Sequence, residues 1–66
     1  MEIVVNGAPR QVGDGMSLDQ VVTLICDAAS GIAVAVNGEV VRRAAWPATS
    51  LAPGDQVEVL TAVQGG

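Results

Sequence analysis

The sequence predicts a two-layer α+β domain, in which one helix packs on one face of a mixed sheet of four to five strands. Three observations support this prediction. Asn-Gly pairs at 6–7 and 37–38 each divide a short run of branched residues into a hairpin. One amphipathic segment lies between the two hairpins. An alternating strand then follows near the end of the 66 residues, a length that allows only one small domain.

The first hairpin is predicted from Glu2–Val5, the Asn6-Gly7 turn and a second strand at about Arg10–Val12. Asn-Gly suits the two positive-φ positions of a type I′ turn, which is the strongest short hairpin signal. Pro9 has no N–H to donate to a sheet. The second strand should therefore lie at an edge.

A single amphipathic helix is predicted over residues 18–30. Ser17 is a suitable N-cap, and Gln20, three residues later, completes a capping box. Apolar residues then recur at helical spacing and should form one buried stripe: Leu18, Val21, Val22, Ile25 and Ala29. Gly31 lies where a left-handed C-cap is expected.

A second hairpin is predicted from Ile32–Val36 and Glu39–Val41, which flank the second Asn-Gly pair. Residues 42–55 then resemble a loop, because prolines and a Pro-Gly-Asp turn interrupt them. Within this loop, Leu51 is the expected core anchor. Trp46 is expected to cover the core, since a small core does not leave its largest side chain exposed.

The last strand is predicted over Gln56–Val63. The helix between the hairpins can cross over the sheet, and the right-handed crossover rule then allows the first and last strands to pair in parallel at the centre. This is a β-grasp arrangement. We expect residues 1–63 to form one β-grasp domain and residues 64–66 to form a flexible tail.

Composition excludes several function classes. Histidine is absent and Cys26 is the single cysteine, so we expect no metal site, no internal disulfide and no histidine base. The net charge of −4 opposes nucleic acid binding. No apolar stretch approaches the ~20 residues of a membrane span, and with no targeting signal the expected location is cytoplasmic. Cys26 itself is expected to be a small hydrophobe on the helix.

The last residues, Gly65 and Gly66, follow the final strand closely. They would present a terminal carboxylate on a thread without side chains, which a partner enzyme can enclose narrowly. A carboxylate becomes an acyl donor only after activation, for example by ATP-dependent adenylation. The alternative is an ordinary frayed terminus, because glycine is common.

Four stretches carry a resemblance to a known family: VNGEVV at 36–41, Arg43 with Trp46, GDQVE at 54–58 and TAVQGG at 61–66. Together with the order of elements, they resemble the ubiquitin-like sulfur carriers of bacterial thiamine biosynthesis. The resemblance covers essentially the whole chain and is most specific in its second half. Arg42 is a departure, since many relatives are expected to have proline there.

This resemblance implies that an adenylating, E1-like enzyme uses ATP to convert the Gly66 carboxylate to an acyl-adenylate. Sulfur drawn ultimately from cysteine by an upstream donor would displace AMP and leave a thiocarboxylate, from which thiazole synthase takes the sulfur. Gly66 would be the reactive residue, Gly65 its flexible neighbour, and Gln64 with Val63 the exit from the sheet. The protein would be a co-substrate rather than an enzyme, would bind no cofactor and would be monomeric when free.

Strand alternation predicts a partner-binding patch on the sheet face that the helix leaves uncovered. Its expected members are Val4, Leu60 and Ala62. Glu39, Asp55 and Glu58 are expected to meet basic residues of the adenylating enzyme, or else to be simply solvated. The alternative for the patch is that exposed aliphatic residues are ordinary, or that the loop around Trp46 covers them.

Two other functions are consistent with the sequence. The chain can be a carrier for another pathway, such as molybdopterin, cysteine or tRNA thiolation. It can also be a non-reactive β-grasp interaction module, in which Gly65 and Gly66 have no chemical role. Adding a residue after Gly66 separates the two classes, because only a carrier should lose its function.

Overall fold

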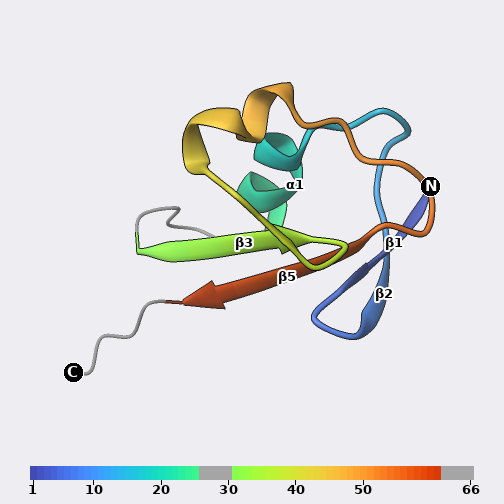
Figure 1. Cartoon of the computed structure of the whole chain (residues 1–66). Helices are drawn as coiled ribbons and strands as arrows, with labels where there is room; N and C mark the ends of the chain where they lie inside the picture. Colours follow the sequence, from blue (N-terminus) through green and yellow to red (C-terminus); the bar gives the residue numbers. More distant parts are fainter. Residues whose placement is uncertain (26–30, 62–66) are drawn as a thin grey trace.

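The computed structural model describes residues 1–25 and 31–61 (Figure 1). These described residues form a five-stranded mixed sheet, one α-helix and one 3-10 helix, so the predicted α+β class is confirmed. In chain order the elements are β1 (Glu2–Val5), β2 (Ala8–Gln11), α1 (Leu18–Ile25), β3 (Ile32–Val36), β4 (Glu39–Val41), η1 (Arg43–Ala48) and β5 (Gln56–Thr61).

The strand order in the sheet is β2-β1-β5-β3-β4, with the last strand of the chain at the centre. β5 pairs in parallel with β1 and antiparallel with β3, while β1–β2 and β3–β4 form antiparallel hairpins. The predicted parallel pairing of the first and last strands is therefore confirmed. Helices α1 and η1 lie on the same side of β3 and β5 (Figure 1), which gives the β-grasp arrangement.

Both hairpins turn at their Asn-Gly pair. Asn6 and Gly7 have φ angles of 49° and 83°, and Asn37 and Gly38 have 51° and 86°, as a type I′ turn requires. β2 begins at Ala8 rather than at Arg10, so Pro9 lies within the strand, opposite Val4. This is tolerated because β2 is an edge strand, as predicted.

The start of α1 follows from its capping box. The Ser17 N–H donates to Gln20 Oε1 at 3.0 Å, and the Gln20 N–H donates to Ser17 Oγ at 3.2 Å. The predicted apolar stripe is buried at three positions and half-buried at the fourth: Leu18, Val21, Val22 and Ile25. The rest of the predicted helix, with Cys26 and Ala29, lies outside the described residues.

The predicted loop contains the 3-10 helix η1, which packs against α1. Its centre is Trp46, only 1% exposed, whose Nε1–H donates to the Val41 carbonyl oxygen at 2.9 Å. The prediction that Trp46 covers the core is confirmed. The loop around Trp46 packs on the helix side of the sheet, against α1, and Leu60 on the other sheet face stays 64% exposed. The alternative, in which this loop covers that other face, is therefore wrong. A stretch this short has no apolar periodicity, and the sequence therefore did not reveal its helical turn.

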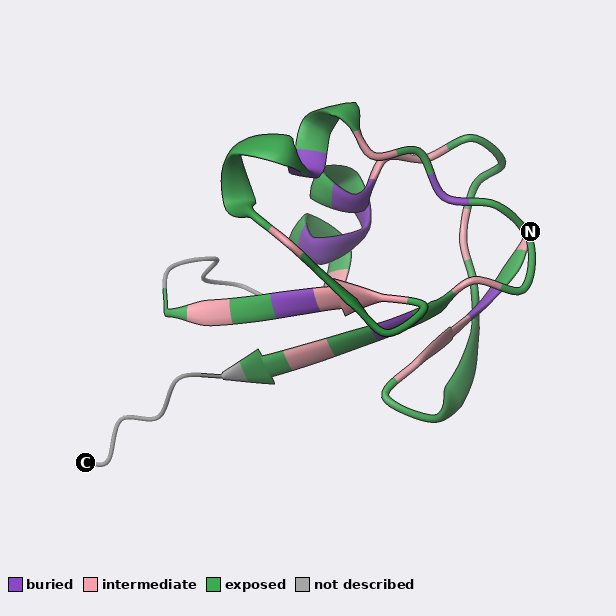
Figure 2. Cartoon of the chain, in the orientation of Figure 1, coloured by how far each residue is buried: buried purple, intermediate pink, exposed green. Residues whose placement is uncertain are grey.

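The core lies between the sheet and the two helices (Figure 2). Aliphatic residues from both layers and Trp46 form it, and the predicted anchor Leu51 belongs to it. The buried members are Ile3, Leu18, Val21, Val22, Val34, Trp46, Leu51 and Val57. No polar or charged side chain of the described residues is buried with them, so the fold depends on aliphatic packing.

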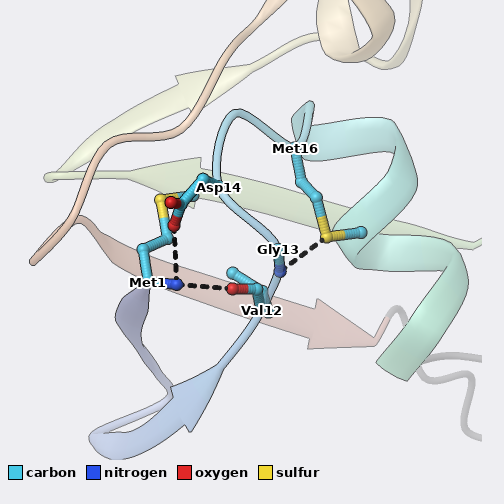
Figure 3. A network of polar contacts seen from close by, with 5 residues as sticks. All are labelled: Met1, Val12, Gly13, Asp14 and Met16. Atoms are coloured by element: carbon cyan, nitrogen blue, oxygen red, sulfur yellow. Dashed lines mark hydrogen bonds and ion pairs between the residues drawn. The ribbon is translucent and has the colours of Figure 1, made fainter.

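The N-terminal end of β1 is held by polar contacts (Figure 3). The α-ammonium group of Met1 donates to the Val12 carbonyl oxygen at 2.6 Å and pairs with Asp14 Oδ1 at 2.9 Å. Nearby, the Gly13 N–H donates to Met16 Sδ at 3.2 Å. These contacts connect the first hairpin to the segment that leads into α1. Because Asp14 is exposed, the ion pair stabilises the fold only weakly.

Candidate functional site

The candidate site begins where β5 ends. Thr61 is the last described residue, and Gly66 follows it five positions later in the sequence. Five of the predicted site residues lie outside the described residues: Ala62, Val63, Gln64, Gly65 and Gly66. The structure therefore describes the strand from which this C-terminal segment (residues 62–66) continues, together with the surface around that strand.

β5 has two distinct faces. Val57 is fully buried and Val59 half-buried on the helix side, while Glu58 and Leu60 alternate with them and are exposed on the opposite side. Leu60 is 64% exposed. We call this uncovered side of the sheet the outer face. It carries Leu60, as the sequence predicted.

Val4 also lies on the outer face, but apart from Leu60. It is paired with Gln56, which lies four residues before Leu60 on the same strand. At ~3.3 Å per residue, the two side chains are about 13 Å apart along the sheet. Val4 is half-buried and lies opposite Pro9 on the edge strand. The structure thus does not bring Val4 and Leu60 together into one patch.

The apolar neighbours of Leu60 come instead from β3 and β4. Ala33 is directly opposite Leu60, Ala35 is opposite Glu58, and Val40 on β4 is opposite Ala35. Val40 is 77% exposed. We call these four residues the outer patch: Ala33, Ala35, Val40 and Leu60. Three of them were missed from the sequence, because their position depends on the register between β3 and β5.

Of the three acidic residues considered from the sequence, only Glu58 lies beside the outer patch. The Asp55 carboxylate is used within the fold, since its Oδ2 accepts from the Ala52 N–H at 2.8 Å and its Oδ1 accepts from Asn37 Nδ2 at 3.1 Å. Glu39 is opposite Val36 and therefore on the other sheet face, at the β4 edge. Of these three carboxylates, Glu58 is thus the one that is exposed beside the outer patch.

Within residues 1–25 and 31–61 there is no pocket and no group of three or more metal-ligating side chains. No helix in the same part of the chain is long and apolar enough to cross a membrane. Two surface features of the described residues bear on recognition. They are the outer patch with Glu58, and the end of β5 that leads into the C-terminal segment.

Comparison with known proteins agrees with this arrangement. The ThiS family profile matches residues 3–66. The crystal structure of the thiamine biosynthesis protein (ThiS) from Geobacter metallireducens is similar, with a TM-score of 0.87 and 35% identity over 100% of both chains. The solution structure of a thiamine biosynthesis protein from the same organism gives a TM-score of 0.83 and 33% identity, covering 100% of this chain and 88% of that one. A search of curated protein sequences found no match. Because the profile spans almost the whole chain and the fold agrees, this protein belongs to the ThiS family.

Proposed function

We propose that this protein is a sulfur carrier for thiamine biosynthesis and that Gly66 is the residue that carries the sulfur. The observation that supports this most directly is the extent of the family match, which runs through Gly65 and Gly66. The structural relatives are thiamine biosynthesis proteins of the same fold. Residues 1–63 would be the recognition domain, and residues 64–66 the reactive tail.

The proposed chemistry has three steps. An oxygen of the Gly66 carboxylate attacks the α-phosphorus of ATP, and pyrophosphate leaves, giving an acyl-adenylate. A sulfur nucleophile at the oxidation level of sulfide then attacks the acyl carbon, so that a C–S bond forms, the C–O bond to AMP breaks and a thiocarboxylate results. Finally, thiazole synthase takes up the sulfur: water attacks the acyl carbon, the C–S bond breaks, and the Gly66 carboxylate is restored. Gly66 is therefore consumed and regenerated.

Each of these steps needs groups that a partner must supply. In the proposed scheme an E1-like adenylating enzyme binds the ATP, and an upstream donor delivers sulfur that comes ultimately from cysteine. The chain is a protein co-substrate and holds no cofactor itself. Gly65 supports this role because it places no Cβ beside the acyl group where the partner must approach.

The outer patch supports a docking role next to this chemistry. Leu60 and Val40 are large apolar side chains that remain mostly exposed, and they belong to the central strand β5 and to the edge strand β4. An exposed apolar cluster with a polar neighbour is typical of a protein-binding surface. We therefore place contact with the adenylating enzyme on this patch, with Glu58 facing a basic group of the partner.

The deciding experiment is mass analysis of the C-terminal peptide after incubation with ATP, a sulfur source and the cognate adenylating enzyme. Sulfur in place of oxygen at Gly66 supports the proposal. The peptide must be isolated, because this exchange nominally matches one methionine oxidation, and Met1 and Met16 are both present. The control is the chain extended by one alanine after Gly66, which should acquire no sulfur.

The outcomes separate the alternatives. An unmodified Gly66 in the presence of a working control carrier would refute the carrier role and favour the non-reactive interaction module. A thiocarboxylate that thiazole synthase does not accept would instead indicate a carrier for another pathway, such as molybdopterin, cysteine or tRNA thiolation.

A further inference from the structure

Two asparagine side chains bind the central strand from the two hairpin turns. The Asn37 Oδ1 accepts from the Gln56 N–H at 3.0 Å, at the start of β5. The Asn6 Oδ1 accepts from the Val59 N–H at 2.8 Å, near the end of β5. Asn6 Nδ2 also donates to the Val59 carbonyl oxygen, at 3.3 Å. The carboxamide of Asn6 therefore bonds both backbone groups of one residue.

Asn6 takes the place of the β1 backbone where that strand has ended. The parallel pairing of β1 with β5 ends at Val5 opposite Val57, and the last backbone bond runs from the Asn6 N–H to the Val57 carbonyl oxygen at 2.9 Å. In a continued parallel ladder, the two groups of Val59 would bond the next backbone acceptor and donor of β1. The chain turns away at Asn6, and its side chain provides that acceptor and donor instead.

Val59 lies where β5 needs this support. The residue is opposite Val34 of β3 on one side, while β1 has already turned away on the other. It immediately precedes Leu60 of the outer patch and lies seven positions before Gly66. The ends of strands open at little free-energy cost, so two hydrogen bonds at this position shift the balance between a paired and an open strand end.

We propose that Asn6 is a positioning residue: its carboxamide holds the end of β5 in the sheet, and this paired strand end is the form that the adenylating enzyme binds. The inference depends on the proposed carrier function. A chain whose strand end is open must be ordered again when it binds, so the apparent affinity falls in proportion to the ordered fraction. Once the complex has formed, the chemistry at Gly66 is unchanged.

The test compares Asn6→Gly with Asn37→Gly in ATP–pyrophosphate exchange catalysed by the cognate adenylating enzyme. Glycine accepts the φ angles of 49° and 51° at these two positions, so both variants remove the carboxamide without straining the turn. Each variant loses one acceptor for a β5 backbone N–H, which makes Asn37→Gly a matched control for general destabilisation. Asn6→Asp keeps the acceptor but loses the donor, and so provides a partial rescue.

We expect Asn6→Gly to raise KM by up to about fivefold for each of the two hydrogen bonds lost, with kcat unchanged. Hydrogen exchange of the Val59 amide in the free protein should also accelerate, because this N–H loses its acceptor. Asn37→Gly should leave KM and the exchange rate of the Val59 amide close to those of the unchanged protein. For Asn6→Asp, both values should lie between those of the unchanged protein and those of Asn6→Gly. Equal KM shifts in both glycine variants, or no shift in Asn6→Gly, would overturn the inference. If the unchanged protein supports no exchange at all, the proposed function fails first, and the positioning role fails with it.

Discussion

Leu60 and Leu24 form a matched pair that tests the proposed docking surface. Leu60 is 64% exposed on the outer face, and Leu24 is 60% exposed on α1, in the other layer of the fold. Replacing each with alanine removes the same atoms from two side chains of similar exposure. If the outer patch binds the adenylating enzyme, only Leu60→Ala should weaken the complex.

The expected magnitude follows from the area that is free to be buried. Three carbon groups at about 0.8 kcal/mol each give about 2.4 kcal/mol for complete burial. Since only the 64% that is exposed can be newly buried, the loss is about 1.5 kcal/mol. This corresponds to about a tenfold increase in Kd.

Isothermal titration calorimetry of each variant against the adenylating enzyme measures this difference. Leu24→Ala should bind like the unchanged protein. Urea unfolding followed by the fluorescence of Trp46 checks that both variants remain folded, because this single aromatic residue is buried only in the native state. Equal losses of affinity in the two variants, or a larger loss in Leu24→Ala, would refute the assignment of the outer patch.

Three further predictions concern stability, measured by the same urea unfolding. Val57→Ala should lower the free energy of unfolding by about 2–3 kcal/mol, because Val57 is fully buried. Val40→Ala should lower it by less than about 0.5 kcal/mol, because Val40 is 77% exposed. Similar losses in the two variants would contradict the assigned core. Ser17→Ala should lower the free energy of unfolding by about 1 kcal/mol, because the helix loses its N-cap. An unchanged urea midpoint would show that the capping box does not contribute to stability. Arg42 has φ −66° and ψ 146°, a backbone conformation that proline also adopts. Arg42→Pro should therefore raise the free energy of unfolding by about 0.4–1 kcal/mol. A lower free energy of unfolding would show that the Arg42 N–H is needed.

The features predicted correctly from the sequence are those that local chemistry determines. An Asn-Gly pair has few alternatives to a type I′ turn, and Ser17 with Gln20 satisfies the first backbone donors of a helix within a span of four residues. The parallel pairing of the first and last strands at the centre of the sheet followed from the crossover rule once the helix was placed between two hairpins. These inferences need no knowledge of distant contacts.

The features missed depend on contacts between distant segments. The turn of η1 is stabilised by the burial of Trp46 against α1, which no pattern within six residues can indicate. Ala33 and Val40 join Leu60 only through the pairing of β3 with β5 and β4. For the site itself, the sequence identified the surface that contains Leu60 but not its neighbours. It placed Val4 beside Leu60, although the register separates them along the sheet.

The central position of β5 has a consequence for the synthesis of the protein. In the sheet, the two hairpins are joined only through this strand, because β1 and β3 both pair with β5 and not with each other. The chain leaves the ribosome from its N-terminus, so both hairpins emerge before the strand that unites them. A nascent chain interrupted before Gln56 cannot complete the sheet, and proteases would remove it as an unfolded polypeptide. Completion of the fold is thereby coupled to translation of the stretch that leads into Gly65 and Gly66.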